Sequence, residues 1–293
     1  MQRRKPGFLN VVKRSFTEFS KHDPLRLAGA TAFFTSFALP AVLLIILQIA
    51  RLVLSRKESG EELFVKLNKY VGEQSATHLI NVLKGFEKVA TNWMAMVAGF
   101  IFLLFVATTL FKVIKNSLND LWNVKVVAER SFALTLKMRL RELVVVLSAA
   151  VLFLLTLLLE GMQAVATEVF LKSSGFARFV LNGSIRFVIS VVIVTIWFGI
   201  IFCFLPDGRL PVSIGFTGAL VTSILFNAGK LGLKSVLLDS KLNTIFGSSA
   251  SVVLVLLFVF YSSLIFYFGA AYTKVFAENK GIDIRPLSHA VPA

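Results

Sequence analysis

Charged residues are scarce in this chain of 293 residues: they make up 16% of it, whereas apolar residues make up 56%. Soluble domains are closer to about 45–50% apolar and about 25% charged. So few charged side chains cannot cover the core that a chain of this length would bury, which argues against a soluble globular enzyme. Together with a mean hydropathy of +0.79, the composition predicts an integral membrane protein.

Residues that carry common chemistry are also few. Cys203 is the only cysteine, so the chain forms no internal disulfide and its redox compartment cannot be inferred. The three histidines lie too far apart in the sequence for a metal site, and neither a phosphate-binding glycine loop nor a nucleophile motif is present. We therefore expect no catalytic residues, metal, cofactor or nucleic-acid partner, and ribonuclease activity in particular is not expected.

Long apolar runs are what the chain does have. Six of them reach the roughly 20 residues that cross a bilayer as a helix. The sequence thus predicts an all-α integral membrane protein with a six-span membrane domain over residues 27–273. The expected spans are 27–54, 93–114, 143–166, 183–205, 210–233 and 248–273.

The excess of basic residues predicts the orientation of these spans. The chain has 31 Lys and Arg against 16 Asp and Glu. The two tails and the loops on their side carry 17 of the basic residues, and the opposite side carries 10. Because short cytoplasmic loops are enriched in Lys and Arg, we expect both termini to lie in the cytoplasm.

Three segments outside the spans have expected structures. The cytoplasmic tail 1–26 has apolar residues at helical spacing between Phe8 and Phe19, which predicts an amphipathic helix in the membrane interface; a mobile basic tail is the alternative. Segment 55–92 has two apolar stripes separated by Gly72, which predicts an outer helical hairpin between spans one and two. The tail 274–293 is expected to be cytoplasmic and, from Asn279 onward, where it contains two prolines, to fray.

Ionisable residues at membrane depth are candidate functional residues. Four of the five lie in the expected outer half of the spans, and polar residues three positions away share a helix face with three of them. These side chains either line a cavity for an anionic head group or extend to the outer interface while the acid pairs with a base. The candidate substrate-binding residues are Arg51, Glu160, Arg186, Lys230, Gln48, Gln163 and Asn227.

A second polar cluster follows the second expected span on the cytoplasmic side. Its amides and lysines recur at helical spacing, so they share one side of a helix. The cluster is either a functional site or a polar, capped helix end that packs on the cytoplasmic loop. Its members are Lys112, Lys115, Asn116, Asn119 and Asp120.

Several short motifs give the chain a resemblance to a known family. They are LAGATAFF at 27–34 leading to Pro40, SLNDLW at 117–122, LP at 205–206 with GAL at 218–220, and YSSLI at 261–265 with FGA at 268–270. In this order and with six expected spans, the chain resembles the YihY/virulence factor BrkB family of bacterial inner-membrane proteins. The family usually has an acidic residue after the last motif, where this chain has Ala271.

The resemblance implies a fold and a location more safely than an activity. Members have been labelled as a ribonuclease and as serum-resistance factors, and one branch is linked to the export of lipopolysaccharide precursors. The lipid link agrees with the outer cationic residues, so we expect a protein that binds or translocates an anionic amphipathic substrate, with anionic membrane lipids as partners. The alternative is a structural or scaffold protein of the cell envelope that binds an envelope protein.

Overall fold

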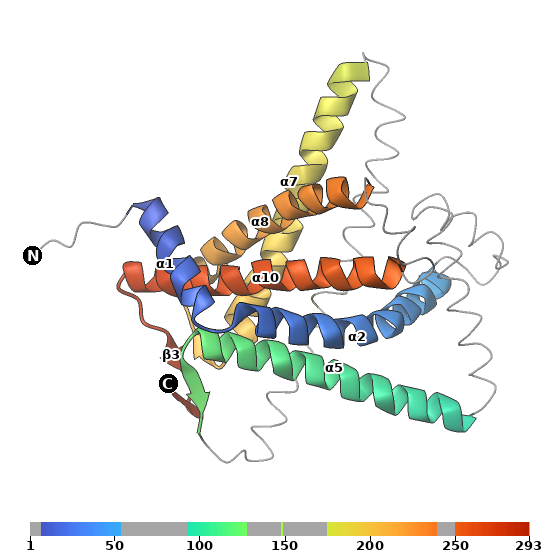
Figure 1. The fold of residues 1–293 in the computed structure, drawn as a ribbon, viewed down its shortest axis with the longest axis horizontal. Coiled ribbons are helices and arrows are strands. Elements are labelled where there is room, and N and C mark those ends of the chain that lie inside the picture. The colour runs from blue at the N-terminus through green and yellow to red at the C-terminus, as the bar shows by residue number, and fades with distance from the viewer. Residues whose placement is uncertain (1–6, 54–92, 128–147, 149–174, 239–249, 293) are drawn as a thin grey trace, which may run out of the picture. The chain divides into compact units, whose positions relative to one another are not determined.

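The computed structural model describes residues 7–53, 93–127, 148, 175–238 and 250–292, which are mostly helical (Figure 1). The chain divides into two compact units, one formed by Met1–Thr31 and Val113–Ala293, the other by Ala32–Lys112. The elements are, in chain order, α1 (Phe8–Ser20), α2 (Pro24–Val53), α5 (Trp93–Leu121), β1 (Val124–Val126), α7 (Gly175–Phe204), β2 (Gly208–Arg209), α8 (Val212–Leu238), α10 (Ala250–Asn279), β3 (Arg285–Pro286) and β4 (Ala290–Pro292).

Three of these helices are long and apolar enough to cross a membrane. The qualifying segments are Phe187–Phe204 in α7, Val212–Gly232 in α8 and Val253–Asn279 in α10. They fall on the last three spans that hydropathy predicts, and α2 and α5 are helices over the first two. The outer hairpin, 55–92, lies outside the described residues, and so does the third expected span, 143–166, apart from Ser148.

Local sequence explains where several helices begin and end. Pro24 opens α2, where its missing N–H would have no partner within the helix in any case. Pro211 directly precedes α8. The helix α10 continues to Asn279, beyond the expected end of the span at 273, and Gly281 then adopts a left-handed φ of 68°. Glycine tolerates this conformation after a helix C-terminus because it has no Cβ.

Glycines allow α8 to pack closely between α7 and α10. A Cβ at Gly215 would collide with the sulfur of Cys203 on α7, and one at Gly218 would collide with Thr273 on α10. Further along the same interface, a Cβ at Gly229 would collide with Tyr261. Small residues at such positions let membrane helices approach and gain van der Waals contact, which is their main source of association in lipid.

Aromatic rings fill the space that α7 and α10 share with α8. The buried rings of Phe202 on α7 and Phe266 on α10 stack with centroids 5.4 Å apart, and Phe198 meets Phe226 of α8 edge to face at 5.9 Å. Aromatic pairs in these geometries add to the stabilisation that burial gives. Some of the chain's 29 phenylalanines thus fill the interface of these three helices.

The C-terminal tail does not fray, contrary to the expectation from its composition. Strand β3 pairs with β2 in antiparallel register, with Pro286 opposite Gly208. Strand β4 pairs with β1, with Val291 opposite Lys125. The backbone N–H of Leu287 also donates to the carbonyl of Asp207 at 2.8 Å. These strands are two or three residues long, too short to show a hydropathy period, and their partners are remote in sequence.

Candidate functional site

A buried ionic cluster lies where the C-terminal end of α5, the turn between α7 and α8, and the C-terminal tail meet. Asp207 stands at its centre and is fully buried. Lys115 of α5 places its Nζ 2.9 Å from Asp207 Oδ1, and His289 of the tail places its Nε2 3.1 Å from the same oxygen. Asn119, one helical turn after Lys115, donates from Nδ2 to Asp207 Oδ2 at 2.9 Å. We call these four residues the Asp207 cluster.

The Asp207 cluster satisfies both the side chain and the backbone of its central residue. Asn119 Oδ1 accepts a hydrogen bond from the Asp207 backbone N–H at 2.8 Å, so the two residues bond reciprocally. Burial by itself would raise the pKa of Asp207, but the hydrogen bond and charge of Lys115, with the hydrogen bonds of His289 and Asn119, lower it below the ordinary value. The carboxylate is therefore ionised and held by two other segments of the chain, α5 and the C-terminal tail.

A second layer of polar contacts lies beside the Asp207 cluster. The indole N–H of Trp122 donates to the carbonyl of Ala270 on α10 at 3.0 Å. The buried hydroxyl of Tyr267 lies 2.6 Å from Thr31 Oγ1 and is hydrogen-bonded to Ser117. These hydrogen bonds connect the beginning of α2, the end of α5 and α10.

The expected cytoplasmic cluster divides between two environments. Lys115 and Asn119 point inward and join Asp207, whereas Asn116 and Asp120 are exposed on the other side of α5. Lys112 is exposed and belongs to the second unit. The helix end is thus polar on both sides, but only the side that carries Lys115 and Asn119 forms part of a buried site.

Asp207 and His289 were not among the residues predicted from the sequence. Asp207 was detectable as the only acidic residue in the short segment between two apolar runs, beside the LP motif at 205–206. His289 gave no signal, because it lies in a tail that was expected to fray. Its contact with Asp207 joins residues 82 positions apart.

The expected outer cluster is described at two positions of α8, and both contact Ser190 of α7. Asn227 is buried in α8 and accepts a hydrogen bond from Ser190 of α7 at 2.7 Å. Lys230, one turn later, is exposed, and its Nζ lies 3.5 Å from the same Ser190 hydroxyl. Of the other candidates, Arg51, Gln48 and Arg186 lie on α2 and α7 with undescribed side chains, and Glu160 and Gln163 lie outside the described residues.

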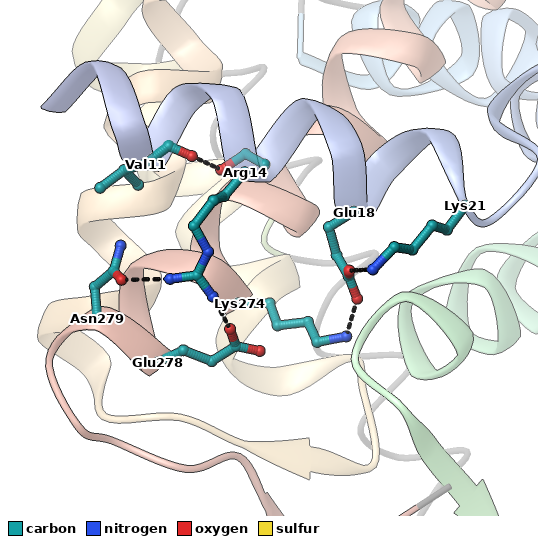
Figure 2. A network of polar contacts seen from close by, with 8 residues as sticks. Val11, Arg14, Glu18, Lys21, Lys274, Glu278 and Asn279 are labelled. Carbon is teal, nitrogen blue, oxygen red and sulfur yellow. Dashed lines mark hydrogen bonds and ion pairs between the residues drawn. The ribbon is translucent and has the colours of Figure 1, made fainter. Parts of the chain in front are cut away.

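Ion pairs fasten α1 to the end of α10, as Figure 2 shows. Lys274, buried on α10, lies 2.5 Å from Glu18, which also pairs with Lys21 of its own helix at 3.1 Å. Arg14 contacts Glu278 at 3.0 Å and Asn279 at 2.7 Å. Burial by itself would raise the pKa of Glu18, but its hydrogen bonds with the two lysines and their charges lower it.

Four segments that charge counting assigns to one side of the membrane meet in the first unit. The N-terminal helix α1 contacts α10 near its C-terminal end, and β1 after α5 pairs with the C-terminal tail. The turn between α7 and α8 pairs with the same tail through β2. Their contacts place these segments together at one end of the first unit, and the side of the membrane that this end faces stays a prediction. Within the described ranges, no three His, Cys, Asp or Glu side chains form a group that could hold a metal ion.

Apolar helices long enough to span a bilayer, packed through glycines and joined at one end by a buried ionic cluster, define an α-helical integral membrane protein. Within that class, the chain belongs to the virulence factor BrkB family, whose model matches residues 15–292. The match confirms the resemblance that the sequence motifs indicate.

Two curated relatives are each described as a UPF0761 membrane protein. One, from Teredinibacter turnerae, is 23% identical over 92% of this chain and 61% of its own length. The other, from Saccharophagus degradans, is 22% identical over 90% of this chain and 59% of its own length. The chain therefore spans about three fifths of the length of these relatives. No solved structure matches it.

Proposed function

We propose that this protein binds or translocates an anionic amphipathic lipid in the bacterial inner membrane, with the head group held at Lys230. The carrying observation is that Lys230 is exposed in a segment of α8 apolar enough to span a membrane, and that its Nζ contact within the described part of the chain is with Ser190, at a long 3.5 Å. A lysine in this position has hydrogen-bonding capacity left for a phosphate. Ionisable residues within membrane segments commonly mark ligand or ion pathways.

The polar residues beneath Lys230 support this proposal because they are fixed in place. Asn227 donates to the Ser223 carbonyl at 3.0 Å while it accepts from Ser190. Ser223 in turn donates to the Val191 carbonyl at 2.8 Å, which ties α8 to α7. The Ser190 hydroxyl beside Lys230 is thus held in place before any ligand binds, which lowers the entropic cost of binding.

The sequence extends the proposed site to the other candidates. Arg51 and Arg186 would add positive charge to the head-group site, and Glu160 would organise the cations. Gln48 and Gln163 would donate neutral hydrogen bonds. The protein would act without catalysing a reaction, and any translocation would be passive or driven by a gradient, because no ATP-binding motif is present.

Lipid retained through purification tests the proposal. The full-length protein, Lys230→Gln and the control Lys125→Gln are purified in parallel from bacterial inner membranes, and bound phospholipid per protein is measured by mass spectrometry. Lys125 is also exposed but lies in β1, outside the candidate spans. Loss of one charge-assisted contact is worth about 1.5–3 kcal/mol, so anionic lipid should fall by roughly tenfold or more in Lys230→Gln alone.

Two results would contradict the proposal. Equal retention in Lys230→Gln and Lys125→Gln would mean that Lys230 does not hold the head group. Retention of neutral and anionic lipids in the proportions of the membrane would mean that the unaltered protein does not select by charge. Either outcome would favour an envelope scaffold over a lipid-binding protein.

A further inference from the structure

The helix α1 carries two apolar faces, and α10 covers only one of them. Val11 and Phe19 are buried, and their neighbours on α10 are Tyr272 and Val275 for Val11 and Phe268 for Phe19. This division was not visible in the sequence, where one continuous stripe from Phe8 to Phe19 was expected to rest on lipid.

The second apolar face has no covering element among the described residues. Leu9 is 81% exposed and Phe16 is 62% exposed. They are seven residues apart, which is about two turns of a helix, so they project from the same side. Val12, between this side and the docked side, is half-buried and packs against the cluster of Val11, Tyr272 and Val275. We call Leu9 and Phe16 the free apolar face of α1.

Position along α10 places this free apolar face beside the membrane. The residues of α10 that α1 contacts, from Phe268 to Asn279, all belong to the segment Val253–Asn279 that is apolar enough to span a bilayer. Ion pairs with Lys274 and Glu278 hold α1 against this end of the helix (Figure 2). A helix fixed at the last turns of a membrane span lies at the depth of the lipid head groups and upper acyl chains.

The charge beside the free apolar face is positive. Lys13 is exposed and lies four residues after Leu9, on the polar edge of the same face. The acid of α1, Glu18, is already paired with Lys274 and Lys21. Arg3, Arg4 and Lys5 precede the helix in the sequence. Basic residues beside apolar ones are the pattern of helices that lie in an anionic leaflet.

We infer that the free apolar face of α1 is a lipid-binding surface that inserts into the anionic leaflet of the membrane, while its opposite face stays docked on α10. The occupant is lipid rather than a second copy of the chain, because this face adjoins a membrane span and its border is basic. The helix α1 would therefore lie between α10 and the surrounding lipid and contact both. The inference goes beyond the proposed function, because it concerns neither Lys230 nor a transported substrate.

A fluorophore on α1 tests this contact in the full-length protein. A bimane is attached to cysteine at Phe16 or, as the matched control, at the adjacent exposed Thr17, in a Cys203→Ala background. Each protein is reconstituted in vesicles that contain phosphatidylcholine and phosphatidylglycerol. One of these two lipids carries a nitroxide quencher near its head group. The Phe16 label should be quenched more strongly than the Thr17 label, which lies about 100° further around the helix.

Placing the nitroxide first on one lipid and then on the other tests whether the anionic or the neutral lipid contacts position 16. Quenching at Phe16 should be greater when the anionic lipid carries the nitroxide, and Lys13→Gln should reduce this preference by up to about fivefold. Equal quenching at Phe16 and Thr17 would overturn the inference. The inference would also be overturned if the Phe16 label were unquenched and the unlabelled cysteine at position 16 formed disulfide-linked dimers. The free apolar face would then bind a second copy of the chain. Lipid retention at Lys230 is independent of all these results.

Discussion

Replacing Asp207 with asparagine removes one negative charge from a side chain with no exposed surface. The asparagine keeps the shape of the side chain and can still bond to Asn119 and His289. It cannot neutralise Lys115, whose own side chain is 7% exposed and whose Nζ lies 2.9 Å from the carboxylate. The variant therefore leaves a buried cation without its partner.

The size of the effect follows from that unpaired cation. Removing one partner of a buried ion pair destabilises a protein by about 3–5 kcal/mol. Because hydrogen bonds to Asn119 and His289 remain, we expect Asp207→Asn to lower the free energy of unfolding by roughly 3 kcal/mol, near the lower end of this range. The control is Asp120→Asn, which changes an exposed acid on the same end of α5 and should alter stability by less than about 0.5 kcal/mol.

The assay is the free energy of unfolding in mixed micelles, measured by titration with sodium dodecyl sulfate. Lys115→Met is measured alone and together with Asp207→Asn, because the double variant no longer contains an unpaired charge. The sum of the losses of unfolding free energy in the two single variants should then exceed the loss in the double variant by about 0.5–3 kcal/mol. Additive effects, or an Asp207→Asn variant as stable as Asp120→Asn, would refute the ion pair as the basis of the site.

The pH dependence of the same variants supplies the sign of the charge effect. The pKa of Asp207 is lowered from its ordinary value of 3.8, so between the lowered value and 3.8 the unfolded chain binds a proton that the folded chain does not. The stabilisation is thus complete above about pH 4 and is lost as the pH falls through the lowered pKa. The difference in stability between the unaltered protein and Asp207→Asn should shrink below pH 4; a constant difference would contradict this reasoning.

Two further predictions concern helix packing and orientation. Gly218→Ala should destabilise the protein by about 1–3 kcal/mol, because its Cβ would collide with a threonine of α10. The same change at Gly232, where nothing lies within 4 Å, should be neutral or slightly stabilising; equal thermal stabilities would argue against the close packing of α8 on α10. In a Cys203→Ala background, a cysteine at Lys66 should react with an impermeant thiol reagent added to spheroplasts. One at the exposed Lys125 should react only after lysis, and its labelling in intact spheroplasts would reverse the predicted orientation.

The helices of the membrane domain could be predicted from sequence because each one depends on its own residues. A backbone in lipid must satisfy its hydrogen bonds internally, so an apolar run of sufficient length forms a helix whatever surrounds it. The helices α7, α8 and α10 illustrate this, since they follow runs that hydropathy alone identifies. The shared face of Lys115 and Asn119 was predictable for the same reason, because helical spacing is a local property.

Tertiary structure determined which of those faces became a site. Lys115 and Asn119 are buried because Asp207, 88 residues after Asn119, is brought against them. The ordering of the C-terminal tail depends on β1 and β2, which lie far from it in the chain. In the same way, α10 divides the apolar stripe of α1 into a docked face and a free one. Hydropathy and spacing describe only neighbours along the chain, whereas these contacts depend on segments that only folding brings together.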